Sequence, residues 1–122
     1  IEVWSACFMN QELVLSCGDE GNLKFWDTRA TSRPIQILKQ FESGVTCVSP
    51  HPVNENLVAC SSYDETLCLY DIRYMNEKKP LVHTKPLGGG IWRIKWHPYI
   101  RNRILVGAMH GGCRVLQVHG MD

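Results

Sequence analysis

The stretch 88–93 and the turn 108–112 contain the side chains of this sequence best suited to chemistry. Arg93 follows a run of glycines, and a guanidinium group can pair with a carboxylate or stabilise an oxyanion. The backbone N–H groups of Gly88, Gly89 and Gly90 could add donors, and the lack of side chains there allows close approach. His110 could act as a general base. Together, these residue types could serve acid–base chemistry with stabilisation of a developing negative charge.

Several catalytic and metal-binding motifs are absent from the sequence. It has no Gly-x-Ser-x-Gly elbow of serine esterases and no Gly-x-x-x-x-Gly-Lys-Ser/Thr loop of nucleotide hydrolases. The 6 cysteines form no Cys-x-x-Cys pair, which leaves zinc-ribbon and thioredoxin-type sites without support. Most cysteines sit in apolar stretches such as 57–60. This predicts buried free thiols, a reducing compartment and a cytoplasmic location.

Composition and charge argue against two classes of partner. The 122 residues are 44% hydrophobic and 20% charged, which is typical of a folded protein. The formal net charge is +1, too small to attract nucleic acid or an anionic membrane strongly. No apolar run approaches the ~20 residues that a membrane-spanning helix needs. We therefore expect neither direct nucleic-acid binding nor membrane binding.

An internal repeat organises the chain. Residues 23–29 (LKFWDTR) are echoed by residues 67–73 (LCLYDIR), and 49–52 (SPHP) by 95–98 (KWHP). Short segments rich in Val, Ile, Leu and aromatic residues alternate with turns of Gly, Pro, Asn and Asp, and no helical apolar period is sustained. The sequence thus predicts an all-β chain. Its expected strands are 3–8, 13–17, 23–27, 35–40, 45–49, 57–61, 66–71, 81–85, 91–96, 104–108 and 113–118.

This repeat resembles the WD-repeat family, whose members are β-propellers. The resemblance rests on the pairs at 26–27 (Trp-Asp) and 70–71 (Tyr-Asp), which close the third strand of a unit. Glu20 and Asp64 stand in the preceding hairpin turns, where an acid can accept backbone N–H bonds and hold the turn. The aromatic residue of each pair is expected to pack between neighbouring blades.

The third unit departs from this pattern. His110 replaces the acidic turn residue, and Leu-Gln at 116–117 replaces the Trp-Asp pair. Phe41 stands where the family usually has a histidine before the first strand of the second unit. The resemblance implies a fragment of two full blades and most of a third, at about 1–40, 41–86 and 87–122. A propeller needs 4–8 blades, so we expect these units to be part of a longer propeller.

A narrower resemblance concerns the run 88–98 (GGGIWRIKWHP). It is similar to the diphthamide-biosynthesis subgroup of WD-repeat proteins, as are the pieces at 2–4, 62–65 and 108–112. The subgroup comprises diphthine methyl esterases. The resemblance therefore implies a carboxylic-ester hydrolase that removes the methyl ester from methylated diphthine on translation elongation factor two. Methanol is the product that leaves, and no metal or organic cofactor is expected.

Under this resemblance the catalytic candidates are His110 and Arg93. His110 would be the base, because it occupies a turn in which the other units carry acids, and Arg93 would stabilise an oxyanion or pair with a carboxylate. A structural alternative is open for each. His110 could be a turn residue hydrogen-bonded to the backbone, and Arg93 could line a solvated channel.

The substrate-binding candidates are aromatic residues and their neighbours. Trp92, Trp4 and Tyr63 could surround the trimethylammonium group of diphthine with aromatic faces. Asp64 could orient an imidazole or attract the same cation, and Gly89 and Gly90 would allow close approach. The alternatives are packing of the tryptophans between blades and a turn-holding role for Asp64.

Propeller geometry predicts which loops share a face. We place the loops 18–22, 41–44, 62–65, 87–90 and 109–112 on one face. The His-Pro turns at 51–52 and 97–98 and the arginine segments after each third strand then lie on the opposite face, where His51 and His97 are expected to be satisfied loop residues.

A second function class is a binding module without chemistry. Residues 26–29 and 70–73 end as do the boxes of WD-repeat substrate receptors of cullin-type ubiquitin ligases. In those receptors the arginine contacts the ligase adaptor, which would assign Arg29 and Arg73 to that contact here. The structural alternative is an ion pair of each arginine with a neighbouring acid. A pure scaffold is the third possibility.

Overall fold

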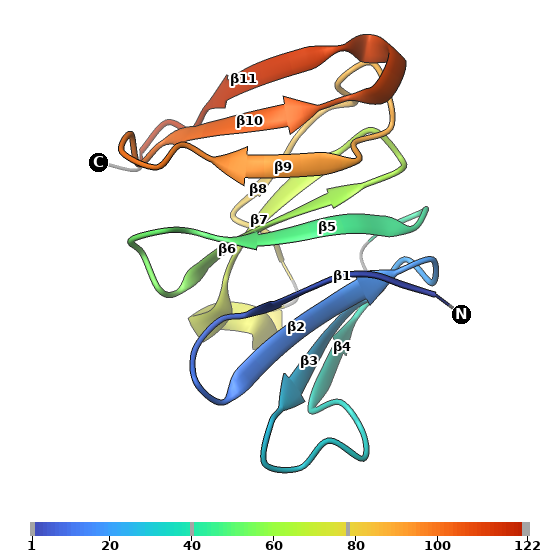
Figure 1. The fold of residues 1–122 in the computed structure, drawn as a ribbon, viewed down its shortest axis with the longest axis vertical. Coiled ribbons are helices and arrows are strands. Elements are labelled where there is room, and N and C mark those ends of the chain that lie inside the picture. Colours follow the sequence, from blue (N-terminus) through green and yellow to red (C-terminus); the bar gives the residue numbers. More distant parts are fainter. Residues whose placement is uncertain (1, 40, 78, 121–122) are drawn as a thin grey trace.

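The computed structural model describes residues 2–39, 41–77 and 79–120, and these form antiparallel β-sheets (Figure 1). The all-β prediction is confirmed, although two short 3-10 helices were not expected. The elements are β1 (Val3–Phe8), β2 (Leu13–Gly18), β3 (Leu23–Asp27), β4 (Gln36–Leu38), β5 (Val45–Pro50), β6 (Leu57–Ser62), β7 (Leu67–Asp71), η1 (Ile72–Glu77), β8 (Val82–His83), β9 (Arg93–Trp96), β10 (Arg103–Gly107), η2 (Met109–Gly111) and β11 (Cys113–Gln117).

Each predicted strand corresponds to a strand of the structure, with small differences at the ends. The fourth segments differ most, because β4 and β8 are shorter than the predicted 35–40 and 81–85. Each is an outer strand that pairs on one side only, and Pro34, Pro80 and Pro86 beside them cannot donate a backbone hydrogen bond. Gln40, at the end of one predicted strand, lies outside the described residues.

The strands form three meandering sheets stacked in a row. Their orders are β1-β2-β3-β4, β5-β6-β7-β8 and β9-β10-β11. Figure 1 shows the sheets one above another, with the first strands β1, β5 and β9 side by side along the stack. Successive repeat units thus place equivalent strands next to each other.

Two apolar cores fill the spaces between the sheets. One joins the first and second sheets through residues such as Leu15, Phe25 and Val58, and the other joins the second and third through Leu69 and Ile104. The second sheet is therefore covered on both faces, and all six residues of β6 are buried. Four of the five residues of β11 are exposed, because no further sheet covers its outer face here.

The ends of β3 and β7 carry the same local clasp. The backbone N–H and Nε of Arg29 donate to Asp27 Oδ1 at 2.9 and 3.0 Å, and its Nη2 donates to Oδ2 at 2.8 Å. Arg73 binds Asp71 through the same atoms at 3.0, 3.0 and 2.6 Å. These hydrogen bonds lower the pKa of Asp27 to about 2 and lower that of Asp71. The stabilisation from each clasp is therefore fully present above the ordinary aspartate pKa. The stabilisation from the Asp27 clasp is lost as the pH falls through about 2, where Asp27 becomes protonated.

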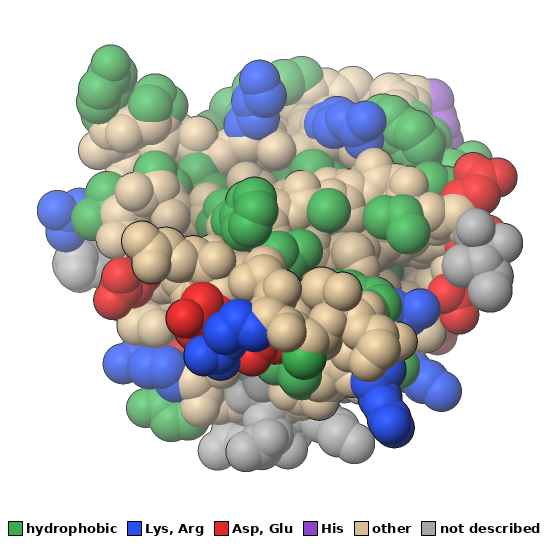
Figure 2. Space-filling model, turned by 60° about the horizontal axis from the view of Figure 1, so that its bottom comes forward, with side chains coloured by type: hydrophobic (Ala, Val, Ile, Leu, Met, Phe, Trp, Pro, Cys, Tyr) green, Lys and Arg blue, Asp and Glu red, His purple; other side chains and the backbone are tan. Residues whose placement is uncertain are grey.

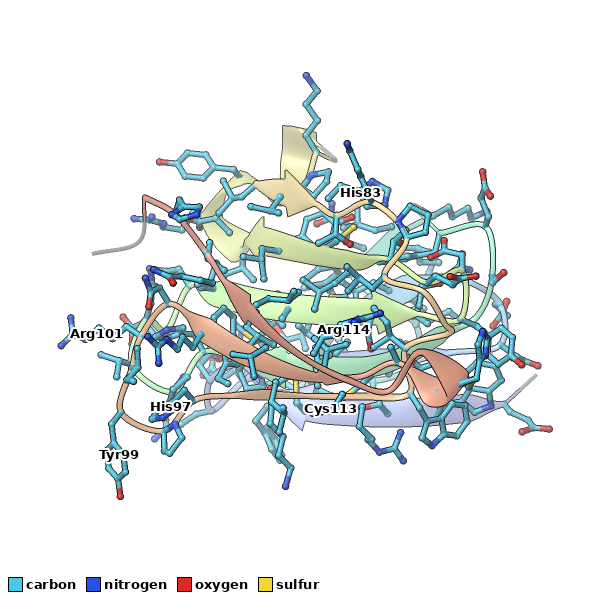
Figure 3. All side chains as sticks on the ribbon, turned by 90° about the horizontal axis from the view of Figure 1, so that it is seen from above. His83, His97, Tyr99, Arg101, Cys113 and Arg114 are labelled. Carbon is cyan, nitrogen blue, oxygen red and sulfur yellow. The ribbon has the colours of Figure 1, made fainter. Side chains whose placement is uncertain are left out.

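Histidines close the turns after β5 and β9. His51 Nδ1 accepts the amides of Val53 and Asn54 at 3.0 and 2.9 Å, and His97 Nδ1 accepts those of Tyr99 and Ile100 at 3.0 and 2.9 Å. Both histidines are the satisfied loop residues expected from the sequence. Figure 3 shows His97, Tyr99 and Arg101 at one end of the third sheet.

His51 also links two sheets. Because its Nδ1 accepts two amides, its Nε2 carries the proton and donates to the Arg101 carbonyl at 2.7 Å. The imidazole meets the Trp96 ring edge-on, with 4.6 Å between centroids, and Trp96 Nε1 donates to the Ser49 carbonyl at 3.0 Å. The turn of the second sheet is thereby fixed to the third.

The acidic turn residues differ in what they hold. Asp64 Oδ1 accepts the Thr66 amide at 3.1 Å and the Thr66 hydroxyl at 2.5 Å, as expected of a turn-holding acid. The same expectation for Glu20 is wrong, because its carboxylate pairs with Lys24 Nζ at 3.1 Å. The neighbouring Asp19 binds backbone instead, accepting the amide of Glu2 at 2.8 Å.

The two repeat aromatics have different polar partners. Trp26 Nε1 donates to Ser16 Oγ at 2.8 Å. Tyr70 is 1% exposed, and its hydroxyl has no well-formed hydrogen bond in the described part of the chain, since only the weakly interacting Cys68 thiol lies beside it. Burial raises the pKa of this phenol, with Cys68 and Cys60 adding to the shift, so the hydroxyl stays protonated. A buried orphan hydroxyl costs stability.

No helix among the described residues is long and apolar enough to cross a bilayer. On the face shown in Figure 2, acidic and basic side chains are interspersed with hydrophobic ones. This mixture agrees with the small net charge of the sequence.

The orphan hydroxyl predicts the effect of Tyr70→Phe. Removing the oxygen relieves the cost of an unpaired buried group, so we expect the free energy of unfolding to be unchanged or to rise by about 1 kcal/mol. Urea denaturation followed by circular dichroism measures the change. The matched variant Trp26→Phe loses the hydrogen bond to Ser16. Its free energy of unfolding should fall by about 1 kcal/mol. A clear loss of stability in Tyr70→Phe would contradict this reading of the hydroxyl.

Candidate functional site

Irregular pairing at the start of each first strand brings three equivalent residues to one end of the sheets. In β1 the pairing moves from Val3↔Gly18 to Ser5↔Cys17 and leaves Trp4 unpaired. In β5 the same shift leaves Thr46 unpaired. In the third sheet Trp92 and Arg93 both face Gly107, since the Trp92 amide donates to its carbonyl at 3.0 Å and Arg93 is its register partner. Such bulges redirect side chains.

The indoles of Trp4 and Trp92 meet across the second sheet. Their ring centroids are 5.9 Å apart, with the planes inclined by 46°. The second sheet has the smaller Thr46 at the equivalent position. Gly44 leaves further room, because a Cβ there would lie 2.2 Å from Cζ3 of Trp4. The contact between the first and third sheets thus requires small residues in the second.

The Thr46 side chain links the second sheet to Ile91, the residue before Trp92. It is completely buried, and its hydroxyl lies 2.9 Å from Ser61 Oγ and 3.2 Å from the Ser61 carbonyl oxygen. The same hydroxyl contacts the Ile91 carbonyl. The position of Trp92 is therefore set by a buried hydrogen-bond group of the neighbouring sheet.

Charged groups surround the indole pair. The Arg93 guanidinium carbon lies 5.3 Å from the centroid of the Trp92 ring, and Nη1 donates to the Trp92 carbonyl at 2.9 Å. Trp4 Nε1 donates to Glu2 Oε2 at 3.3 Å. Two aromatic faces, one cation and one carboxylate thus occupy the same end of β1 and β9. We call Glu2, Trp4, Trp92 and Arg93 the indole site.

The glycine loop before β9 packs tightly against the turn after β10. A Cβ on Gly89 would lie 2.1 Å from the Ala108 carbonyl oxygen, and one on Gly90 would lie 3.2 Å from both Met109 Sδ and the Tyr63 carbonyl oxygen. Gly89 and Gly90 are buried. Close packing of the loop is a sufficient reason for glycine at both positions.

No hydrogen bond or ring contact joins His110 to Arg93 among the described residues. His110 is exposed in η2, and its side chain makes no hydrogen bond or ion pair with any described residue. Backbone bonds close this turn, since the amide of Gly111 donates to the Ala108 carbonyl at 2.8 Å and that of Ala108 donates to the Gly112 carbonyl at 2.9 Å. The alternative of an imidazole that holds the turn is therefore wrong.

Asp64 and Tyr63 belong to the neighbouring turn. Asp64 also accepts the Glu42 amide at 3.4 Å, which adds to its turn-holding contacts. The Tyr63 amide donates to the Gly44 carbonyl at 2.9 Å, while its ring is 52% exposed and, within the described residues, contacts neither indole. The structure thus joins Trp4, Trp92 and Arg93 but leaves Tyr63, Asp64 and His110 outside this cluster.

The adaptor candidates lie at the opposite end of the sheets. Thr28, beside Arg29, donates its amide to the Glu12 carbonyl, and Ile72, beside Arg73, donates to the Asn56 carbonyl, both at 2.8 Å. The ion pairs expected as the structural alternative are present for both arginines. Their side chains are nevertheless 67% and 57% exposed.

The cysteines are free and their burial matches the sequence-based expectation. Cys17, Cys47, Cys60 and Cys68 are buried, and Cys113 is exposed on β11 (Figure 3). Burial raises the pKa of Cys17 and Cys68 to about 12, so both thiols are protonated at neutral pH. In the ranges that the structure describes, no three His, Cys, Asp or Glu side chains are grouped to hold a metal ion.

Sequence comparisons show which proteins this chain is similar to. The model "WD domain, G-beta repeat" matches residues 32–71. Diphthine methyltransferase of Homo sapiens is 41% identical over 117 residues, which cover 94% of this chain and 25% of that protein. The chain is a partial WD-repeat β-propeller and a homologue of the diphthine methyltransferases.

Two further relatives agree. The diphthine methyltransferase homolog of Dictyostelium discoideum is 36% identical, over 94% of this chain and 34% of that protein. Diphthine methyltransferase of Mus musculus is 39% identical, over 94% of this chain and 24% of that protein. The chain thus spans about a quarter to a third of the length of these curated relatives. In this WD-repeat context the three sheets are propeller blades, and β1, β5 and β9 are the first strands of successive blades.

Sequence reasoning missed Thr46, Gly44 and Glu2 as parts of the site. The signal for Thr46 was present, because Val45-Thr46 aligns with Ile91-Trp92 once the units are superposed. A small residue between two tryptophans at equivalent positions would have indicated that the indoles could meet.

Thr46→Val tests the buried tie to Ile91. Valine has the same shape but lacks the hydroxyl, so the Ile91 carbonyl loses its partner and we expect unfolding to become easier by about 1–3 kcal/mol. Thr46→Ser keeps the oxygen and should retain most of the stability. Thermal denaturation of both variants measures the difference. Equal stability of the two would show that the hydroxyl contributes nothing.

Proposed function

We propose that the complete protein hydrolyses the methyl ester of methylated diphthine on translation elongation factor two. Water adds to the ester carbonyl carbon, the bond from that carbon to the methoxy oxygen breaks, and methanol leaves with one proton. A diphthine carboxylate and a second proton remain. The proposal is supported by the similarity to proteins named diphthine methyltransferase and by the indole site. It includes a cytoplasmic location, where this substrate is found.

The observation that carries the proposal is the indole pair beside Arg93. Diphthine has a trimethylammonium group close to its carboxyl group. An indole face attracts such a cation, and a guanidinium can bind a carboxylate or the oxyanion that forms when water attacks an ester. Trp4, Trp92 and Arg93 supply both functions within one cluster.

His110 is the proposed base, and its exposure permits this role. Its imidazole has no partner among the described residues, so it is available to a substrate that reaches the turn 108–112. The proposal requires the substrate ester to lie between the indole site and this turn, because His110 and Arg93 must act on the same carbonyl group. Gly89 connects the two, because it packs directly on Ala108.

Variants of Arg93 and His110 test the enzymatic proposal. We expect Arg93→Gln to slow demethylation about 100-fold through loss of oxyanion stabilisation. His110→Gln should slow it by about 100-fold or more through loss of the base. The assay incubates the complete protein with elongation factor two carrying methylated diphthine and follows the modified peptide by mass spectrometry.

The control variant is Arg103→Gln, which removes an exposed arginine on β10 of the same blade and should keep full activity. An unchanged peptide with the folded wild-type protein would overturn the proposal. Full activity in both Arg93→Gln and His110→Gln would remove these residues from the mechanism.

A second candidate function is binding to a cullin-type ligase adaptor. The observation that favours it is the pair of identical Asp-x-Arg clasps, which present two exposed guanidinium groups at the end opposite the indole site. The geometry is compatible with both functions in one protein, because the two surfaces lie at opposite ends of the sheets.

The double variant Arg29→Ala/Arg73→Ala separates the two functions. We expect it to lose co-purification with a ligase adaptor and to retain demethylation of elongation factor two. Loss of both together, with a lower melting temperature, would indicate that the clasps are structural. Unchanged co-purification would exclude these arginines from an adaptor contact.

A further inference from the structure

We propose that Arg93 is an internal occupant of the cation site on Trp92, with which a quaternary ammonium ligand competes for the ring. This inference rests on the proposed function, because it describes how the indole site would be regulated. The displaced guanidinium would then be available to the carboxyl group of the same ligand. The predicted ligand class is a quaternary ammonium with a nearby carboxyl or ester group.

Trp92 is 42% exposed, and the Arg93 guanidinium lies over its ring. Its ring has Trp4 as one neighbour, with 5.9 Å between centroids, and the Arg93 guanidinium as another at 5.3 Å. A cation within about 6 Å of an aromatic centroid already gains the electrostatic attraction of that ring. A ligand cation would therefore meet both the bulk and the positive charge of Arg93.

Arg93 is held weakly in comparison with the clasp arginines. Arg29 and Arg73 each bind a carboxylate through Nε and Nη2. Arg93 has one hydrogen bond, to the Trp92 carbonyl, and no carboxylate partner within the described ranges. A guanidinium without an ion pair can leave its position at low cost.

The two indoles have more packing and hydrogen-bond contacts around them than Arg93 has. Gly44 packs on the ring of Trp4, and the buried Thr46 hydroxyl binds the Ile91 carbonyl next to Trp92. Glu2 Oε2 accepts a hydrogen bond from Trp4 Nε1 and adds negative charge beside the rings. Removal of the guanidinium would leave two positioned aromatic faces and a carboxylate, which together favour a cation.

The experiment measures choline binding to the complete protein through the NMR signals of its indole N–H groups. The Trp92 signal is identified by its loss in Trp92→Phe. We expect Arg93→Gln to bind choline about two- to fivefold more tightly than the wild type, because the competing charge is gone. Arg93→Lys keeps the charge and should bind like the wild type.

The uncharged tert-butyl analogue of choline distinguishes charge from bulk. It should bind equally to the wild type and Arg93→Gln if displacement of a cation is the cause. Arg103→Gln should leave choline binding unchanged. Choline affinity in Arg93→Gln equal to or weaker than that of the wild type would overturn the inference, as would an equal gain for the uncharged analogue.

The result separates this inference from the proposed function. In one outcome, Arg93→Gln binds choline more tightly while the wild type does not demethylate elongation factor two. That result would retain the cation site and reject the enzymatic proposal. Demethylation by the wild type without the choline effect would retain the enzyme and reject displacement of Arg93.

Discussion

Packing of one sheet on the next is the interaction on which the rest of this structure depends. A sheet that is apolar on both faces needs a neighbour on each side, and the second sheet has both, so every residue of β6 is buried. The same packing brings β1, β5 and β9 side by side, which places equivalent positions of successive repeats within contact distance. The indole site is a product of this stacking, because Trp4 and Trp92 come from sheets that are not neighbours in the row. Its formation also needs the bulges that redirect both indoles and the small residues that separate them.

The two ends of the sheets show different uses of arginine. At one end, Arg29 and Arg73 are bound to aspartates two residues away, and the cost of ordering each side chain is offset by charge-assisted hydrogen bonds within a single turn. At the other end, Arg93 rests on an aromatic ring without a carboxylate partner in the described part of the chain. The first arrangement suits a fixed surface, and the second suits a group that changes partners during binding.

The sequence predicted the elements well because they depend on local patterns. Alternating apolar residues and turn residues located every strand, and the repeated His-Pro and Asp-x-Arg segments indicated both kinds of turn. The short outer strands were overestimated, since their length depends on pairing with a single neighbour. The indole pair could be suspected from the repeat, but its contact depends on Gly44 and Thr46, which carry no chemical signature. The turn that carries His110 is closed by backbone hydrogen bonds alone, which the residue types did not reveal.

Polar contacts join the second and third sheets near both ends of β5. The Thr46 hydroxyl reaches the Ile91 carbonyl at one end, and the His51 imidazole reaches the Arg101 carbonyl at the other. Contacts near both ends of a strand restrict rotation of one sheet against the next, whereas a single contact would leave that rotation free. The spacing of the two indoles therefore depends on contacts near both ends of β5, because these contacts position the third sheet against the second.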